Sequence, residues 1–196
     1  LKRLSTLIRP GDTVLDLACG PGPLLLELAA LYPDCRFIGA DLSHQMLTVA
    51  RSKLAEAGIS NASVRHGDAT ASPYPDNSAN LVIIHQVLHF LDDPGRALNE
   101  AARVLKPGGR FFCLEFSTTE WPGFGAAYDV YSEKLVPRIG EIVAKDGDSY
   151  RYLIESIRRF PKMPDFARMI GEAGFKTVKY RPILGGAVAI HSGWKI

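Results

Sequence analysis

The chain has 196 residues, 46% of them hydrophobic and 22% charged, which is long enough for one domain with a sizeable core. Its 23 basic and 21 acidic residues leave a formal net charge of +2, a balance that argues against nucleic acid or another strongly anionic partner. Three cysteines without metal-ligand spacing indicate free thiols in a reducing compartment, and we expect no metal site.

The chain shows no signal peptide and no apolar run near 18 residues, so we expect neither a secretory address nor a membrane span in the chain as given. It opens on Leu1-Lys2-Arg3-Leu4, in mid-helix by pattern and without a starting Met. We therefore expect a preceding segment, which includes a lid over the ligand site and is also where a targeting segment would stand.

Strand-like and helical stretches alternate along the first 116 residues, after a short helical face from Leu4 to Ile8 that ends at Pro10-Gly11. The predicted strands cover residues 14–17, 36–40, 62–67, 80–84 and 110–116, and the helices between them cover 24–31, 44–57 and 94–105. A tight turn at residues 106–109 leads into the fifth strand. Alternation of this kind predicts a parallel sheet covered on both faces, with a ligand across the carboxyl ends of the strands.

The second of these helices has recognisable end signals. Ser43 is its predicted N-cap and Gly58 its C-cap. We expect Met46, Val49 and Ala50 to face inward from it.

Regular alternation stops after Phe116. The stretch 117–161 is too long and too apolar for a linker, so we expect it to form a roof over the ligand crevice, with helical pieces around 128–135 and 150–159. A last helix at 165–173 and two strands at 175–181 and 187–192, joined near Gly185-Gly186, predict an antiparallel hairpin at the sheet edge. The whole chain, 1–196, is predicted to be a single domain.

A glycine-rich turn follows the first strand, in the stretch Val14-Leu15-Asp16-Leu17-Ala18-Cys19-Gly20-Pro21-Gly22. Glycine at 20 and 22 lets a ligand lie against the backbone at the start of the next helix. Asp16, at the end of the strand, points a negative charge into the same crevice.

Two features argue against a dinucleotide in this crevice. The third glycine of a G-x-G-x-x-G turn is replaced by Leu25, and Asp16 would repel a phosphate. An acid suits a ligand with an ammonium and a sulfonium, as in S-adenosylmethionine. Asp41, 19 residues beyond Gly22, can accept hydrogen bonds from both ribose hydroxyls, and Asp68-Ala69 would flank the adenine. The alternative is that the loop and the acids are ordinary turn chemistry.

Three strand ends that carry acid at these intervals resemble the class I S-adenosylmethionine-dependent methyltransferases. Over nearly its whole length the chain resembles one family closely, the ubiquinone/menaquinone biosynthesis C-methyltransferases of the UbiE type. The matching motifs are Leu15-Asp16-Leu17-Ala18, Arg103-Val104-Leu105-Lys106-Pro107-Gly108-Gly109-Arg110, Leu114-Glu115-Phe116-Ser117, Tyr128-Asp129-Val130-Tyr131-Ser132, Tyr150-Arg151-Tyr152-Leu153, Glu155-Ser156-Ile157-Arg158 with Phe160-Pro161, Ala173-Gly174-Phe175 and Gly186-Ala187-Val188-Ala189-Ile190-His191. Motifs before Leu114 are common to many methyltransferases, whereas the later ones are more specific.

The resemblance implies a Rossmann-like α/β fold with a seven-stranded, mostly parallel sheet, an antiparallel C-terminal edge hairpin and helices on both faces. It implies S-adenosylmethionine as cofactor, bound by Asp16, Gly20, Pro21, Gly22, Asp41, Leu42, Met46, Asp68, Ala69 and His85. It implies a lipophilic quinol as acceptor, and the side chains expected to shape its pocket are Tyr128, Tyr131, Tyr150, Arg151 and Arg158.

The chain departs from the family pattern in three places. Pro21 stands where the family usually has threonine, and His85 stands where a small residue follows the fourth strand. The family's Phe-Gly-x-Arg-Asn loop is replaced by residues 86–90, so His89 occupies the place of its arginine. Histidine can accept or donate a proton near neutral pH, but it cannot form the two parallel hydrogen bonds of an arginine guanidinium. His89 and His85 are our candidates for the catalytic base.

Methyl transfer to a ring carbon needs in-line placement and an ionised neighbouring hydroxyl. The most favoured function is therefore C-methylation of a polyprenylated benzoquinol or naphthoquinol. The alternatives are a methyltransferase for another aromatic or natural-product acceptor, and a weakly catalytic, cofactor-binding assembly subunit; a dehydrogenase fits poorly. We further expect the protein to lie in the cytoplasm, or in the mitochondrial matrix of a eukaryote, with peripheral contact at the inner membrane face. We also expect a homodimer.

Overall fold

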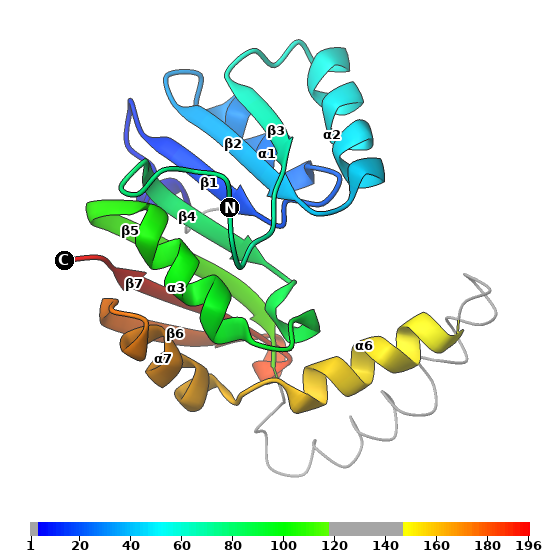
Figure 1. Ribbon diagram of the computed structural model, residues 1–196, viewed down its shortest axis with the longest axis vertical. Coiled ribbons are helices and arrows are strands. Elements are labelled where there is room, and N and C mark those ends of the chain that lie inside the picture. Colours follow the sequence, from blue (N-terminus) through cyan, green and yellow to red (C-terminus); the bar gives the residue numbers. More distant parts are fainter. Residues whose placement is uncertain (1–3, 118–146) are drawn as a thin grey trace.

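The computed structural model describes residues 4–117 and 147–196 of the chain (Figure 1). The predicted helix at 128–135 and the candidate residues Tyr128 and Tyr131 lie outside the described residues, as does the side chain of Tyr150. The described part of the chain forms one seven-stranded sheet with helices on both faces, as expected.

The strand order of the sheet is β3-β2-β1-β4-β5-β7-β6. The strands are β1 (Thr13–Leu17), β2 (Arg36–Asp41), β3 (Ala62–His66), β4 (Ala79–His85), β5 (Leu105–Phe116), β6 (Lys176–Ile183) and β7 (Val188–Trp194). The first five strands run parallel, while β7 pairs antiparallel with both β5 and β6. The predicted antiparallel hairpin at the edge of a parallel sheet is therefore confirmed.

Two apolar layers fill the space between the sheet and its helices (Figure 1). The α-helices are α1 (Pro23–Leu31), α2 (His44–Glu56), α3 (Pro94–Val104), α6 (Gly147–Arg159) and α7 (Met163–Glu172), and the 3-10 turns are η1 (Leu4–Thr6), η2 (Leu88–Phe90) and η4 (Leu184–Gly186). One layer packs α1 and α2 on Val14, Phe37 and Ile83, and the other packs α3 and α7 on Leu15, Val82 and Phe111. These residues alternate in sequence because successive side chains of a strand point to opposite faces.

The predicted inward face of α2 is wrong for Met46 and Val49 and correct for Ala50. Its buried face consists of Leu47, Ala50 and Leu54, whereas Met46 and Val49 are 42% and 43% exposed. Residues three and four apart share a helix face, so a face through 47, 50 and 54 turns position 46 about 100° away from the core. The predicted N-cap is correct, because Ser43 Oγ accepts a hydrogen bond from the Met46 N–H. The C-cap is Ala57 rather than the predicted Gly58, which follows it at a φ of 64°.

β5 begins five residues before the predicted strand. Residues 106–109, predicted as a free turn, are part of it. Ala79 pairs with Leu105 and Leu81 with Arg110, so these four residues bulge out opposite Asn80. Two backbone hydrogen bonds to Lys195, near the C-terminal end of the described chain, hold this bulge in place. The Gly108 N–H donates to the Lys195 carbonyl, and the Lys195 N–H donates to the Gly109 carbonyl.

All three cysteines are free and buried in the described structure, as the sequence predicts. Among residues 4–117 and 147–196, none of the helices is long and apolar enough to cross a membrane.

Candidate cofactor and acceptor site

The loop between β1 and α1 reverses direction through left-handed backbone conformations. Ala18, Gly20 and Gly22 have φ values of 62°, 55° and 73°. A Cβ at Gly20 would meet open space, so the backbone there is accessible to a ligand, whereas a Cβ at Gly22 would lie 3.1 Å from the Cβ of Ala50. Glycine at 22 is thus required by the close packing of α1 on α2, and glycine at 20 exposes the loop to the crevice.

Asp16 lies at the carboxyl end of β1 and is 2% exposed. Its Oδ1 has no hydrogen-bond partner among the described residues. Burial, and then the nearby charge of Asp41, raise the pKa of Asp16 to about 7. A buried carboxylate oxygen with no partner is suited to a ligand cation such as an ammonium group.

Asp41 ends β2 and ties the glycine loop to the start of α2. Its two carboxylate oxygens accept hydrogen bonds of 2.8 Å, one from the Gly20 N–H and one from the Ser43 N–H. Each oxygen keeps a lone pair that can accept from a ribose hydroxyl. Beside it, Leu42 and Met46 expose apolar side chains, which fits contact with the flat face of an adenine.

Asp68 and Ala69 follow β3, at the third strand end. Asp68 Oδ1 accepts from both the N–H and the hydroxyl of Thr70, at 2.7 and 2.8 Å, and Ala69 is buried. The structure thus brings Asp16, the glycine loop, Asp41 and Asp68 to the same edge of the sheet, as the sequence predicts.

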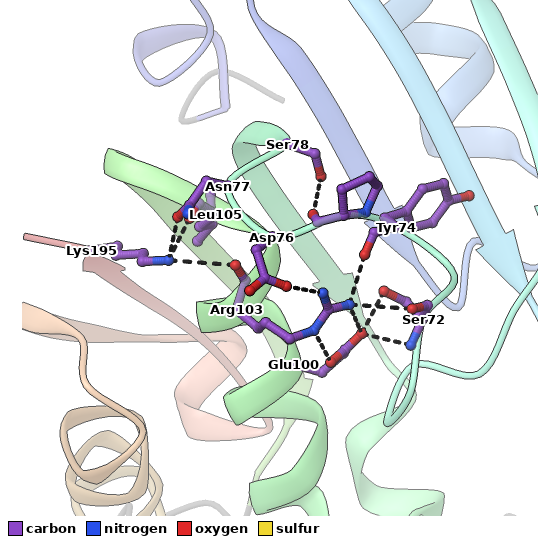
Figure 2. Close-up of polar contacts among 10 residues, drawn as sticks. Ser72, Tyr74, Asp76, Asn77, Ser78, Glu100, Arg103, Leu105 and Lys195 are labelled. Atoms are coloured by element: carbon purple, nitrogen blue, oxygen red, sulfur yellow. Dashed lines mark hydrogen bonds and ion pairs between the residues drawn. The ribbon is translucent and has the colours of Figure 1, made fainter.

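A hydrogen-bond network that the sequence did not predict holds the loop between β3 and β4 (Figure 2). Glu100 Oε1 accepts from the N–H and the hydroxyl of Ser72, both at 2.6 Å, and Arg103 pairs with Glu100 and with Asp76. Arg103 also donates to the carbonyls of Ser72 and Tyr74. The available sequence signal was the acid and base three residues apart on the predicted helix.

The loop after β4 is organised by Glu115 of β5. This fully buried carboxylate accepts from the N–H groups of Val87 and Leu88, both at 2.7 Å, and from His89 Nδ1, also at 2.7 Å. The His89 side chain is completely buried. His85, at the end of β4, is half-buried, and burial lowers its pKa while Glu115 partly opposes that shift.

The two candidate arginines of α6 lie on its exposed surface. Arg151 pairs with Asp148 at 3.0 Å, one turn away on the same helix. The cavity beside α6 is lined instead by Tyr152, Ser156 and Arg159, together with residues of the loop after β4. No sequence-based argument had selected these three side chains for that place.

A family model described as the ubiE/COQ5 methyltransferase family matches residues 3–195. The chain belongs to this family. It is 44% identical over 192 residues to the ubiquinone/menaquinone biosynthesis C-methyltransferase UbiE of Zymomonas mobilis, covering 97% of this chain and 78% of that protein. It is also 44% identical over 190 residues to UbiE of Brucella abortus, covering 96% and 71% of the two chains.

Solved structures place this family member in the class I methyltransferase fold. A SAM-dependent methyltransferase from Aquifex aeolicus is 19% identical, with a TM-score of 0.72 over 100% of this chain and 88% of that one. The [4+2]-cyclase SpnF is 20% identical, with a TM-score of 0.74 over 98% and 80%. At such identities the comparison establishes the fold alone, and a cyclase among the matches shows that the fold does not fix the reaction.

Proposed function

We propose that the chain transfers a methyl group from S-adenosylmethionine to a ring carbon of a polyprenylated quinol. The observation that carries this proposal is 44% identity over 97% of the chain to a protein named as a ubiquinone/menaquinone biosynthesis C-methyltransferase. The strand-end acids support it, because they form a site that fits a cationic nucleoside better than a dinucleotide.

The residues of this chain fit the cofactor as follows. The unpartnered oxygen of Asp16 would hold the amino group, Asp41 the ribose hydroxyls, and Leu42 and Met46 the adenine. Asp68 and Ala69 would flank the other side of the base. When bound, S-adenosylmethionine supplies an electrophilic methyl group on a sulfonium, and the chain need only orient the acceptor and remove a proton from it.

Methyl transfer to a ring carbon also requires that the acceptor lose a proton. A ring carbon is nucleophilic when a neighbouring hydroxyl is ionised, so a base must lie near that hydroxyl. We propose His89 for this task, through its Nε2, with His85 as the next candidate. Both side chains come from the end of β4 and the turn after it, at the carboxyl edge of the sheet.

A polyprenyl tail would keep such an acceptor in a membrane. We therefore propose that the protein meets its acceptor at a membrane surface, on the cytoplasmic side. The homodimer remains a prediction.

The test incubates the full chain with methyl-labelled S-adenosylmethionine and a lipid extract, and identifies the molecule that gains the label. Label in a prenylated quinol supports the proposal. Label in a different aromatic molecule would favour the alternative acceptor, to which the changed loop at 86–90 points. Cofactor binding without any labelled product would favour the assembly role.

A further inference from the structure

A cavity of about 320 Å³ lies between the turn η2 and helix α6. Its walls combine polar side chains with apolar ones, and the apolar residues among them include Phe90, Leu91, Tyr152, Phe160 and Met169. The Phe90 and Tyr152 rings stack, with their centroids 5.7 Å apart and an angle of 11° between the planes. The volume is at the lower end of the range for small-molecule sites, which suits one aromatic ring.

Two polar atoms of residues that line this cavity are buried and have no hydrogen-bond partner within the described part of the chain. They are Nε2 of His89 and Oγ of Ser156. The His89 side chain is fully buried, and Ser156 is 1% exposed. A buried polar atom without a partner is costly, and two of them at one cavity point to a polar group that belongs between them.

Glu115 determines which hydrogen-bonding role His89 can play. A carboxylate can only accept hydrogen bonds, so the 2.7 Å contact with Glu115 Oε2 places the ring proton of a neutral His89 on Nδ1. Nε2 then carries a lone pair and acts as an acceptor or base. Ser156, by contrast, can both donate and accept.

The charges at the cavity define the ligand further. The charged side chains that line it are Asp92 and Arg159, both exposed and of opposite sign. They leave no net charge, so the cavity favours a neutral ligand over an anion or a cation. A neutral aromatic ring with a hydroxyl satisfies all of these features, because its O–H can donate to Nε2 while its oxygen accepts from Ser156.

We propose that this cavity binds the hydroxylated ring of the methyl acceptor, with His89 and Ser156 contacting one ring hydroxyl and Glu115 acting as a positioning residue for His89. This inference rests on the proposed function and assigns it a place in the molecule. The hydroxyl O–H bond breaks, the proton moves to Nε2, and the electron pair stays on oxygen, from which it conjugates to the ring carbon. The carboxylate of Glu115 stabilises the resulting imidazolium.

The first test concerns Ser156. Binding of reduced 2-prenyl-1,4-benzohydroquinone to the full chain is measured by calorimetry, with S-adenosylhomocysteine present to prevent turnover. Ser156→Ala should weaken binding of this probe about three- to tenfold, the effect of one lost hydrogen bond, and leave S-adenosylhomocysteine affinity unchanged. The matched control is Ser52→Ala, which removes an exposed hydroxyl from another helix and should bind the probe normally. Equal binding by Ser156→Ala and the wild type means that the Ser156 hydroxyl does not contact the probe, and overturns the proposal.

The second test concerns Glu115. In Glu115→Gln the amide oxygen can still accept from Val87 and Leu88, but the amide N–H₂ then faces Nδ1 and favours the His89 tautomer protonated on Nε2. Nitrogen NMR of His89 should show this change of tautomer, and kcat should fall about a hundredfold, as for loss of a general base, with little change in probe affinity. A purely structural role for Glu115 would lower stability without a selective loss of kcat, and that result contradicts the proposal.

The outcomes separate this inference from the proposed function. If the wild type methylates a quinol but both variants bind and turn over normally, the cavity assignment fails and the function stands. If the wild type neither binds the probe nor methylates any quinol, both fail.

Discussion

Asp16 is the residue at which stability and function oppose each other most directly. Its carboxyl is buried, one oxygen has no partner, and its pKa is raised from 3.8 to about 7. The folded protein therefore retains a proton between pH 4 and pH 7 that the unfolded chain has released. Since the folded state binds more protons over this range, the ligand-free protein loses stability as the pH rises from about 4 to about 7.

The first prediction replaces this carboxyl with an amide. At pH 8, Asp16→Asn should raise the unfolding free energy of the ligand-free protein by ~2 to 4 kcal/mol, since each unit of pKa shift is worth about 1.4 kcal/mol. The gain should disappear below pH 4, where Asp16 is itself protonated. Urea unfolding at both pH values measures this difference, and an equal effect at pH 4 and pH 8 would contradict it.

The same substitution should weaken cofactor binding, because an amide cannot pair with an ammonium group. For the wild type, affinity for S-adenosylmethionine should rise with pH up to about 7, as Asp16 ionises. Calorimetry from pH 5 to pH 8 gives the profile. An affinity that does not change with pH in the wild type would show that Asp16 does not bind the ammonium group.

Asp41 has a double role, since it both shapes the crevice and faces the expected ribose. Asp41→Ala should weaken S-adenosylmethionine binding by ~1.5 to 3 kcal/mol, the usual effect of losing hydrogen bonds to a charged group. The control is Asp34→Ala, which removes an exposed carboxylate two residues before the amino end of β2. Unchanged affinity in Asp41→Ala would count against the whole cofactor assignment.

At the scale of elements, the loop from β3 to β4 depends on α3 for its position. Arg103 links the two through Glu100, Asp76 and the carbonyls of Ser72 and Tyr74 (Figure 2). The same loop begins at Asp68 and Ala69, the expected neighbours of the adenine. A substitution that destabilises this loop should therefore also lower the protein's affinity for the cofactor.

Arg103→Ala should lower the unfolding free energy by ~1 to 3 kcal/mol, because it leaves the Glu100 carboxylate without its cation and two carbonyls without a donor. Cofactor affinity should also fall, and Arg103→Lys should restore part of both, since lysine keeps the charge but not the fork. Arg96→Ala, at an exposed position of the same helix, is the control. Urea unfolding and calorimetry on the same samples test the coupling, which is refuted if stability falls while affinity does not.

The elements differ in how well the sequence predicts them. Strand–helix alternation, the glycine loop and the acids at three strand ends follow from local chemistry, and the structure has them where predicted. The inward face predicted for α2 was wrong at Met46 and Val49 because these residues are as apolar as the ones that are buried, so periodicity alone does not choose between the two faces.

Glu115 shows a different limit. Its neighbours in the strand, Leu114 and Phe116, are apolar, and its partners Val87, Leu88 and His89 are 26 to 28 residues away in sequence. Only the parallel pairing of β4 with β5 brings them together. The single-domain assignment and the individual roles of the site residues remain predictions.

At the scale of the whole molecule, one buried ion pair joins the segment before β1 to β5, 98 residues further along the chain. Asp12, just before β1, accepts from the Arg9 N–H at 2.9 Å and from Arg110 of β5 at 2.6 Å. The Arg110 guanidinium also lies 5.8 Å from the centre of the Trp194 ring in β7. The pair thus fastens β1, β5 and β7 at one end of the sheet.

Asp12→Ala should destabilise the protein by ~3 to 5 kcal/mol, since it leaves the buried charge of Arg110 without a partner. Asp165→Ala provides the contrast, because it removes an exposed partner of Arg168 on α7 and should cost less than about 1 kcal/mol. Urea unfolding of the two variants compares them. Similar losses in both would show that burial of the Asp12 pair contributes little.

The strand order also has a consequence for how the protein is made. β7 follows β6 along the chain but lies between β5 and β6 in the sheet. While the ribosome is still translating residues 188–194, β5 must remain an open edge, and β6 has no strand to pair with. That edge carries Phe111, Phe112 and Cys113, all buried in the finished fold. The nascent chain therefore exposes an apolar strand edge until β7 emerges, and this interval is when a chaperone would protect it from aggregation.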